Sequence, residues 1–423
     1  MPDTSLRFAA IADDYTGASD LAGMLHAGGV PTVQMFGVPD GAIDHSTVSR
    51  GGAIVVALKT RSVEPAAAVD ASLQALRHLL PLRPRQIQFK YCSTFDSTPR
   101  GNIGPVTEAL LRALGADCAV AVPALPVNGR TQYMGHLFVQ DRLLSESPLR
   151  DHPLNPMSDS NLVRWLGLQT SLPVGLIPLP AVMQGPEAIR VELQRQRDKG
   201  ARIVLIDAVS DADLDAIAAV VCDLPLITGG SGLAQPLARI WNREDVGPPV
   251  RRAMPSPDPA LGTLILAGSC SAATLQQLGR WQATGGRILR VSEPDQIAAA
   301  FAEVRREIGR TGVAAVASSA LPAERSGGCG AAAAFEAAFG DLAAAVTDAG
   351  LASHLIVAGG ETSGAVVDRL GVKAARVAGI VAPGVPSLVS LDARRLCLVL
   401  KSGNFGGPDF FADAIRHREL LST

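Results

Sequence analysis

The stretch KYCSTFDSTPRGNIG, residues 90–104, gathers several side chains that can take part in chemistry. Lys90 can hold a carboxylate, and Asp96 can accept a proton or bind hydroxyl groups. The backbone near Gly101 and Gly104, at the expected start of a helix, can hold an anion. Binding and catalytic groups concentrate on loops that a rigid scaffold positions, which favours a functional role over a polar surface turn.

Two adjacent carboxylates, Asp13 and Asp14, follow a short apolar run near the start of the chain. Such neighbours repel each other unless a cation, a proton or substrate hydroxyl groups relieve the repulsion. The alternative is structural, because Asp14 or Thr16 could simply cap the following helix.

A third polar stretch is VPALPVNGRTQYMGHLFV, residues 122–139, in which Asn128 and Arg130 form a turn after a predicted strand. The guanidinium of Arg130 can bind a carboxylate through two parallel hydrogen bonds. His136 is equally consistent with a structural role. Together the three stretches predict one pocket for a small, anionic ligand that carries several hydroxyl groups.

The second half of the chain contains four loops in which glycine occurs together with serine or threonine. They are LAGSCSAAT at residues 266–274, VAGGETSGAVV at 357–367, APGVPSL at 382–388 and KSGNFGGPDFF at 401–411. When such a loop follows a strand and precedes a helix, its backbone amides and the helix dipole can bind phosphates. No Walker A motif and no GxGxxG fingerprint is present, and glycine also serves ordinary tight turns. Four such loops nevertheless favour a nucleotide.

Each of these stretches follows an apolar run, so the side chains would stand at the carboxyl ends of strands, where open α/β sheets bind ligands. Apolar runs alternate with helical periodicity, which predicts βα units on parallel sheets. Predicted strands cover residues 6–12, 31–36, 53–58, 86–90, 118–122, 202–206, 225–228, 261–267, 287–291, 313–317, 354–358 and 396–400. Predicted helices cover residues 17–28, 65–80, 104–114, 186–199, 211–222 and 331–350, the last a packing helix.

The chain has 423 residues, which is too long for one ordinary core, and it turns proline-rich at VGPPVRRAMPSPDPALG. We predict an α/β fold of two domains, each a mainly parallel sheet flanked by helices, with the active site in the cleft between them. Residues 1–245 would bind a sugar acid, residues 246–261 would form a linker, and residues 262–423 would bind the nucleotide. Residues 141–180 would form an excursion over the cleft or an inserted subdomain.

Composition excludes several classes of protein. With 47% hydrophobic residues, 18% charged residues and a net charge of −2, the chain is neither disordered nor basic enough to predict nucleic-acid binding. Its six cysteines form no CxxC pair, which indicates reduced thiols and argues against a zinc site. No signal peptide and no membrane span is predicted, so we expect a soluble cytoplasmic protein.

The motifs resemble the four-carbon acid sugar kinases, along nearly the whole chain. The resemblance is carried in order by IADDYTGASDLAG, KYCSTFDSTPRGNIGP, PALPVNGRTQYMGHLFV, LITGGSGLA, AGSCSAAT, GGETSGAVV and LKSGNFGGPDFF. Cys92 and Phe95 resemble the branch that acts on 3-oxo-tetronate, whereas Pro99 departs from the leucine common elsewhere in the family. The resemblance implies ATP-dependent phosphorylation of the C4 hydroxyl of a four-carbon sugar acid.

The resemblance, together with the loops, also predicts the site residues. Those expected at the acid are Asp13, Asp14, Lys90, Asp96, Ser97, Thr98, Arg100, Asn128 and Arg130. Those expected at ATP are Ser269, Ser271, Gly359, Gly360, Glu361, Thr362, Ser363, Gly403 and Asn404. Lys90 or Arg130 would hold the carboxylate at C1, and Asp96 or Asp14 would accept the proton of the C4 hydroxyl. Mg²⁺ would bridge the phosphates, although its protein ligands are not predicted.

Three alternatives are open at this stage. One is a D-threonate or D-erythronate kinase, another is a nicotinamide-dependent hydroxy-acid dehydrogenase, and the third is a two-domain sugar-acid binder without catalysis. The partners expected are the sugar acid and ATP, with neither nucleic acid nor a membrane, and a homodimer is left open.

Overall fold

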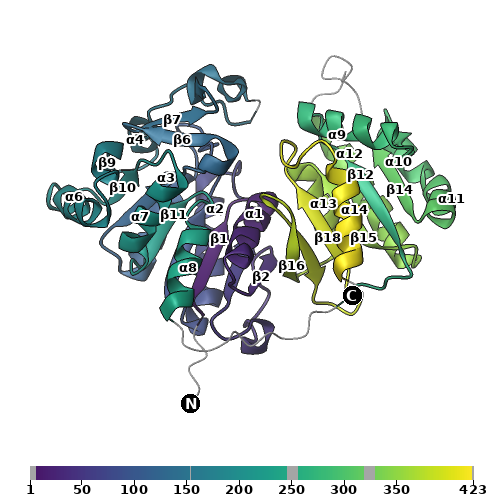
Figure 1. Cartoon of the computed structure of the whole chain (residues 1–423), viewed down its shortest axis with the longest axis horizontal. Coiled ribbons are helices and arrows are strands. Elements are labelled where there is room, and N and C mark those ends of the chain that lie inside the picture. Colours follow the sequence, from purple (N-terminus) through teal and green to yellow (C-terminus); the bar gives the residue numbers. More distant parts are fainter. Residues whose placement is uncertain (1–5, 153, 245–255, 319–328, 422–423) are drawn as a thin grey trace. The chain divides into compact units, whose positions relative to one another are not determined.

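The computed structural model describes residues 6–152, 154–244, 256–318 and 329–421 (Figure 1). The chain divides into two compact units, one made of residues 1–33 and 37–251 and the other of residues 34–36 and 252–423. Of the predicted linker, residues 246–255 lie outside the described part of the chain, and residues 256–261 form no helix or strand.

The sheet of the first unit consists of apolar runs that are buried on both faces. Strands β1 (Phe8–Ala12) and β3 (Ala53–Ala57) are buried at every position, as parallel strands covered by helices on both sides require. The order is β2-β3-β1-β4-β11-β5-β10-β9, and all pairings from β3 to β9 are parallel. The remaining strands are β4 (Gln86–Lys90), β5 (Ala119–Val122), β9 (Val174–Ile177), β10 (Ile203–Ile206), β11 (Leu226–Gly229) and β2 (Thr32–Phe36), of which residues 34–36 are assigned to the second unit.

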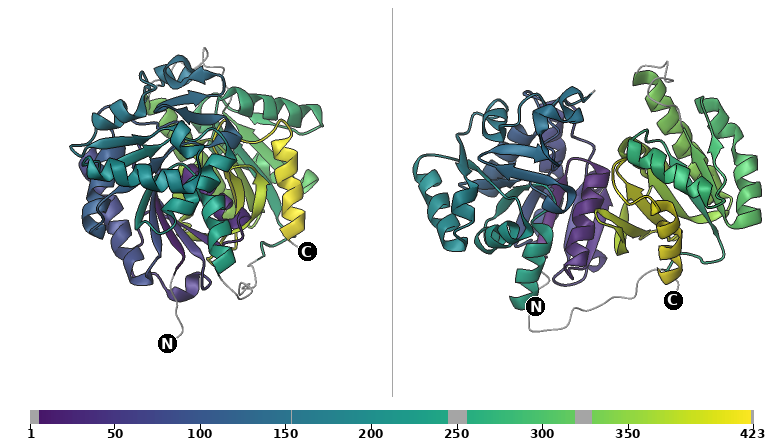
Figure 2. Two further views of the ribbon diagram at one scale, coloured as in Figure 1. Left: turned by 60° about the vertical axis from the view of Figure 1, so that its left-hand side comes forward. Right: turned by 45° about the horizontal axis from the view of Figure 1, so that its top comes forward.

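Helices cover this sheet in two layers (Figures 1 and 2). Along one layer the helices α1 (Tyr15–Ala27), α8 (Ala234–Glu244), α7 (Asp211–Val221) and α6 (Pro186–Asp198) pack in series, with the short α5 (Leu179–Val182) beside α6 and α7. The other layer contains α2 (Pro65–Leu79), α3 (Ile103–Leu114) and α4 (Leu162–Gly167). The first unit is therefore a three-layer α/β domain.

The excursion after β5 adds a small antiparallel sheet that sequence periodicity did not predict. Its strands are β6 (Arg130–Tyr133), β7 (His136–Val139) and β8 (Arg142–Leu143). The buried carboxylate of Asp207 accepts hydrogen bonds from Gln132 Nε2 and from the Gly135 amide, which fixes this sheet to the end of β10. Short 3₁₀ helices are η1 (His45–Thr47), η2 (Leu80–Leu82), η3 (Pro126–Asn128), η4 (Leu144–Glu146) and η5 (Pro148–Asp151).

The second unit has a mixed sheet of order β13-β14-β12-β15-β18-β17-β16. The pairings from β13 to β18 are parallel, whereas β17 runs antiparallel to both β18 and β16. The strands are β12 (Gly262–Ala267), β13 (Leu289–Arg290), β14 (Val313–Ala317), β15 (Ala352–Ala358), β16 (Ala374–Ala382), β17 (Val385–Ser390) and β18 (Cys397–Lys401).

This hairpin corrects one prediction. The APGVPSL stretch, expected as a phosphate loop before a helix, instead joins β16 to β17 with Pro383 and Gly384 at the turn. Gly384 has a φ of 77°, which the second central position of a type II turn needs after proline and which glycine adopts without strain. Three glycine-rich loops, not four, therefore lead from a strand toward a helix.

Helices flank the second sheet as well. Helices α9 (Ala272–Ala283) and α14 (Phe410–Leu421) contact each other, and Phe410 and Phe411 join a buried cluster with Ile265, Ile356 and Val399. Helix α12 (Cys329–Asp348) contacts three others, α10 (Pro294–Ala299), α11 (Phe301–Thr311) and α13 (Gly360–Leu370). Within the described ranges, no helix is both long and apolar enough to cross a membrane.

Candidate active site

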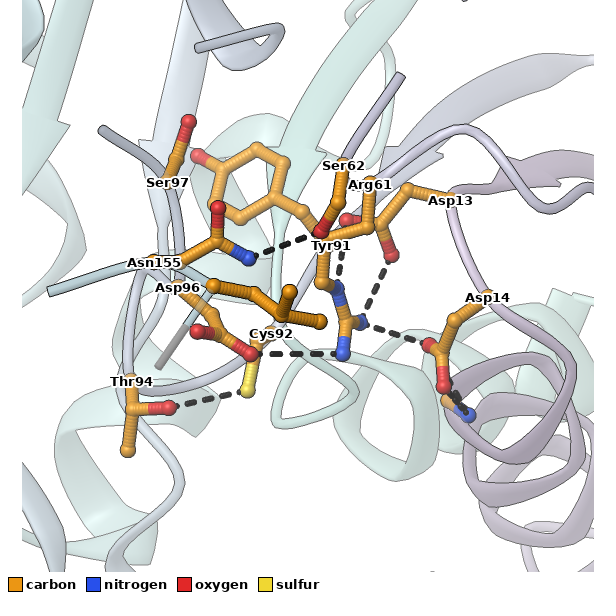
Figure 3. A network of polar contacts seen from close by, with 12 residues as sticks. Asp13, Asp14, Arg61, Ser62, Tyr91, Cys92, Thr94, Asp96, Ser97 and Asn155 are labelled. Carbon is orange, nitrogen blue, oxygen red and sulfur yellow. Dashed lines mark hydrogen bonds and ion pairs between the residues drawn. The ribbon is translucent and has the colours of Figure 1, made fainter. Parts of the chain in front are cut away.

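The centre of the polar site in the first unit is Arg61, a residue that the sequence analysis did not select. Its Nε and Nη2 donate to both oxygens of Asp13 at 3.0 and 2.8 Å, and Nη2 also lies 2.6 Å from Asp14 Oδ1. Its Nη1 lies 3.5 Å from Asp96 Oδ2 (Figure 3). One guanidinium therefore joins three of the predicted site carboxylates.

The sheet brings these residues together because β3, β1 and β4 are parallel neighbours. Ala12 pairs with Ala57 on one side and with Lys90 on the other, so the loops after all three strands start at one edge. The Arg61 amide donates to the Asp13 carbonyl. The loop that carries Arg61 is held from the other side by Asn102, whose Nδ2 donates to the carbonyls of Thr60 and Val63 at 2.6 and 3.0 Å.

Burial and the two nearby cations act in opposite directions on the paired aspartates. Burial raises the pKa of Asp13 above its usual value, and Arg61 offsets this only in part. Burial would also raise the pKa of Asp14, but Arg61 and Lys90 outweigh it and hold the pKa below its usual value. Asp14 is therefore an ionised carboxylate at neutral pH.

Asp14 also serves as the cap of α1, which was the structural alternative for this residue. Its side chain accepts from the Gly17 amide through both oxygens and from Thr16 Oγ1 at 2.8 Å. Both Asp14 oxygens are thus engaged by groups of the protein. Asp96 differs, since its Oδ1 is buried and accepts no hydrogen bond from any described residue. His152 Nδ1 lies 4.0 Å from that oxygen.

Ser97, Thr98 and Arg100 lie on the same loop, and the first two contact the excursion. Ser97 is buried; its carbonyl accepts from Trp165 Nε1 at 2.7 Å and its Oγ from Gln169 Nε2 at 3.2 Å. Gln169 Nε2 also donates to the Thr98 carbonyl, and Arg100 is exposed. Contacts from residues 141–180 therefore hold the Asp96 loop in place.

Lys90 and Arg130 are the two cations predicted to bind the carboxylate. Lys90 is buried, and its Nζ donates to the Tyr91 carbonyl at 3.0 Å. Arg130, at the start of β6, donates from Nη1 to the Asn128 carbonyl, while its buried Nε has no partner among the described residues. Burial raises the pKa of the buried Asp20, and both cations partly counter that rise, so they lie within electrostatic reach of the same carboxylate.

The predicted nucleotide residues lie on three loops of the second unit that start from neighbouring parallel strands. Ala358 of β15 pairs with Ala267 of β12 and with Lys401 of β18. A Cβ atom added to Gly403 would lie 2.4 Å from Ser269 Oγ, and one added to Gly359 would lie 3.2 Å from the Ser269 amide nitrogen. The loops after the three strands therefore pack against one another.

Within these loops the individual residues differ in exposure and in use. Gly359 has a φ of 132° and directly precedes α13, whose first residues Gly360 and Glu361 are exposed. Thr362 and Ser363 are buried. Ser271 caps α9 by accepting from the Thr274 amide at 3.2 Å, and Ser269 Oγ accepts from the Ser271 amide. Asn404 is exposed at the tip of its loop.

The signal that could have identified Arg61 was present in the sequence. It lies in LKTRS, directly after the predicted strand at residues 53–58, which is the position that selected the other candidate loops. A single arginine was less conspicuous than two carboxylates or a glycine-rich loop. For metals, the described residues contain no group of three or more His, Cys, Asp or Glu side chains that could hold an ion.

Two family models match the chain. A sugar-binding N-terminal domain matches residues 8–237, and a nucleotide-binding C-terminal domain matches residues 264–411. A protein from Pseudomonas fluorescens named 3-oxo-tetronate kinase is 45% identical over 415 residues, which cover 96% of this chain and 95% of that protein. A protein of the same name from Salmonella typhimurium is 41% identical over 429 residues, covering 98% of this chain and 100% of that protein.

Two solved structures resemble the whole chain. A protein from Salmonella typhimurium LT2 has a TM-score of 0.86 at 38% sequence identity, with 97% of this chain and 99% of that chain covered. A protein from Haemophilus influenzae has a TM-score of 0.77 at 37% identity, with 96% and 99% covered.

Proposed function

The chain belongs to the four-carbon acid sugar kinase family, and from this premise we propose that it phosphorylates the C4 hydroxyl of 3-oxo-tetronate with ATP. The observation that carries the proposal is the full-length similarity to relatives named 3-oxo-tetronate kinase, since it spans both the sugar-binding and the nucleotide-binding domain. The product is 3-oxo-tetronate 4-phosphate, formed in the catabolism of sugar acids.

The reaction requires alignment and charge neutralisation more than covalent chemistry from the protein. The C4 oxygen attacks the γ-phosphorus in line, the bond from that phosphorus to the bridging oxygen breaks, and ADP leaves. Asp96 accepts the hydroxyl proton in this proposal, because its Oδ1 accepts no hydrogen bond from a described residue. Asp14 is less suited, because both its oxygens are engaged.

The C1 carboxylate of the substrate is held by Arg130 or Lys90. The free Nε of Arg130 favours Arg130, because a buried donor without a partner costs free energy unless a ligand satisfies it. Arg61 contacts Asp13, Asp14 and Asp96, and so positions the proton acceptor relative to the rest of the cluster. Substrate hydroxyl groups would bind among these carboxylates.

The nucleotide is ATP, bound in this proposal by the loops that carry Ser269, Gly359 to Ser363, and Gly403. The exposed start of α13 offers amides that the helix itself leaves unused. Mg²⁺ usually keeps several waters and binds nucleotide phosphates with few protein ligands, so the ion would be held mainly by the phosphates of ATP. It would supply charge neutralisation on the phosphates when bound.

We further propose that residues 1–245 form the acid-binding domain, residues 262–423 the ATP-binding domain and residues 246–261 the linker. Transfer requires the C4 hydroxyl and the γ-phosphate to meet, so the reaction would take place in a cleft between the two domains. Closure of such a cleft would exclude water that could otherwise hydrolyse ATP.

The direct test is a substrate panel with the purified protein. ADP release is measured with 3-oxo-tetronates, D-threonate and D-erythronate, and the phosphorylated product is located by ³¹P NMR. We expect the highest kcat/KM with a 3-oxo-tetronate and phosphate on C4. A higher kcat/KM with D-threonate or D-erythronate would reassign the substrate, and titration calorimetry showing binding of NADH but not ATP would refute the kinase.

A further inference from the structure

Lys401, the last residue of β18, is a buried cation that the proposed reaction has not used. Its side chain is completely inaccessible, and Nζ donates to Thr274 Oγ1 at 3.0 Å, to the Ser402 carbonyl at 3.2 Å and to the Gly403 carbonyl at 2.9 Å. These three contacts use all three hydrogens of the ammonium group. Among the described residues, no carboxylate lies within ion-pair distance of it.

The contacts fix the direction of two successive peptide groups. The Gly403 carbonyl also accepts from Ser271 Oγ at 2.6 Å and from Thr274 Oγ1 at 2.9 Å, so it points firmly toward the ammonium group. In a planar trans peptide, the C=O and the following N–H point in opposite directions. Because the carbonyls of Ser402 and Gly403 point toward Lys401, the amides of Gly403 and Asn404 point away from it.

These two outward amides form a pair that suits an anion. Neither donates a hydrogen bond to any described residue. Successive N–H groups that converge on one side of the backbone make an anion-binding concavity, such as those that hold phosphates. The pair lies beside Ser269, because a Cβ atom on Gly403 would come within 2.4 Å of its Oγ.

We propose that Lys401 is a positioning residue for the nucleotide, which turns the Gly403 and Asn404 amides outward to bind a phosphate and places a positive charge behind them. This inference rests on the proposed function only in naming the anion as a phosphate of ATP. The ammonium itself is buried and does not touch the ligand.

The charge on Lys401 is sensitive to pH within a measurable range, because burial lowers its pKa to about 8. The charged groups on the elements packed around it have partners elsewhere. Arg280 of α9 pairs with Asp409, Asp413 of α14 pairs with Arg416, and His417 of α14 contacts Ser387. On β15, His354 contacts Thr263, and Glu361 at the start of α13 is exposed.

A bound phosphate favours the charged ammonium, so nucleotide affinity should fall as pH rises through about 8. The experiment measures the Kd of ADP by titration calorimetry on the full-length protein from pH 7 to 9.5, for the parent and for Lys401→Met. At pH 7 we expect the variant to bind ADP about 10- to 100-fold more weakly, because it lacks the positive charge behind the two amides and one of the contacts that orient them. Its Kd should then be independent of pH.

Lys401→Met should still fold. The Gly403 carbonyl keeps two hydroxyl donors and the Ser402 carbonyl keeps the Phe405 amide, so no carbonyl is left unpaired, and a buried charge is removed. A matched control is Arg280→Met, which removes one exposed cation of α9 and should leave both the Kd and its pH dependence unchanged. Thermal melting of each variant checks that it is folded.

Three results would overturn the proposal. The first is a Kd of ADP for Lys401→Met within about twofold of the parent value. The second is a parent Kd that does not change through pH 8, and the third is an Arg280→Met variant that weakens ADP binding as much as Lys401→Met does. If Lys401→Met does not fold, the ADP Kd of Thr274→Val tests the proposal instead, because this variant removes only the hydroxyl between Lys401 and the Gly403 carbonyl. An unchanged ADP Kd in Thr274→Val would then refute the inference. If no sugar acid of the substrate panel is phosphorylated but the ADP Kd still depends on pH as expected, the kinase function is refuted and the role of Lys401 is not.

Discussion

Three aspartates share one guanidinium in the first unit, yet they are not equivalent. Asp13 forms a bidentate contact with Arg61, Asp14 caps helix α1, and Asp96 has one oxygen that accepts no hydrogen bond from a described residue. A buried polar atom left without a protein partner is where a ligand is expected. Asp96 is therefore the residue at which catalysis and structure can be separated by mutation.

We expect Asp96→Asn to lower kcat by about 10²- to 10⁴-fold, the usual contribution of a general base, with the ATP Kd unchanged. The substitution keeps the shape of the side chain and removes its charge. The matched control is Asp117→Asn, a surface aspartate of the same unit that forms only an exposed ion pair with Arg202. A loss of melting temperature in Asp96→Asn with near-parental kcat would assign Asp96 a structural role instead.

Arg61 should matter for stability as well as for activity. Arg61→Met leaves the carboxylates of Asp13 and Asp14 without their main cation, and since breaking a fully buried pair typically costs about 3–5 kcal/mol, a loss below that range is expected for these partly buried pairs. Arg61→Lys keeps the charge but cannot contact both Asp13 oxygens through a fork, so a smaller loss is expected. Urea denaturation at pH 7 measures both variants.

The pH dependence of this loss has a definite sign. Arg61 helps to lower the pKa of Asp14 below its usual value of 3.8, so the stability it provides is present above that value and is lost as the pH falls through the lower pKa of the folded state. The difference in unfolding free energy between the parent and Arg61→Met should therefore shrink as the pH is lowered from 7 toward 3. A difference that grows on acidification would contradict this account.

At the scale of elements, the buried Asp207 is one of the residues that attach the antiparallel sheet β6-β7-β8 to the rest of the unit. Asp207 accepts from Gln132 and Gly135 of this sheet and, at 3.0 Å, from the Leu179 amide. Arg130 stands at the start of β6, so the position of this proposed carboxylate clamp depends on how firmly the small sheet is attached.

We expect Asp207→Ala to raise the KM for the sugar acid and to speed hydrogen exchange in β6 and β7, while the KM for ATP stays constant. Three donors lose a charged acceptor, and each such hydrogen bond contributes about 1.5–3 kcal/mol. The matched control, Asp215→Ala on α7, removes a half-exposed aspartate paired with Arg239 and should change none of these quantities. Equal exchange rates in the two variants would show that Asp207 does not anchor the sheet.

Strand positions were predictable because buried parallel strands are short apolar runs. The predicted strand at residues 86–90 coincides with β4, and that at residues 313–317 coincides with β14. The small antiparallel sheet and the β16-β17 hairpin were not predicted. Strands β6, β7 and β16 are partly exposed, and the buried strand β17 carries Pro386, Ser387 and Ser390, so none of them has the pattern of a buried parallel strand.

The sequence predicted where the site lies but only some of the contacts within it. The rule that ligands bind at the carboxyl ends of strands selected Asp13, Lys90 and Asp96, which the structure does bring to one sheet edge. Arg61 was missed because a single arginine after a strand is inconspicuous, and its partners lie 35 to 48 positions away in sequence on loops after other strands. Lys401 was missed because its role depends on the direction of two carbonyl groups, which no sequence pattern reveals.

For the whole molecule, the two family models leave residues 238–263 unmatched between them. This interval contains the predicted linker at residues 246–261, whose prolines cannot continue a helix or sit in a central strand. A semi-rigid linker of this kind would let the two domains move as separate bodies, which a kinase that closes on its substrates needs.

We expect limited trypsin digestion to cut the native protein after Arg251 or Arg252 in this linker, with a second set of cuts in residues 141–160. A compact domain resists trypsin because its backbone must unfold locally before it fits the protease, whereas a linker with few contacts does not. Mass spectrometry identifies the new termini, and the variant Arg251→Gln/Arg252→Gln, which lacks both sites, should lose these fragments and keep the others. A resistant fragment of the parent that runs through residues 246–261 would place the domain boundary elsewhere.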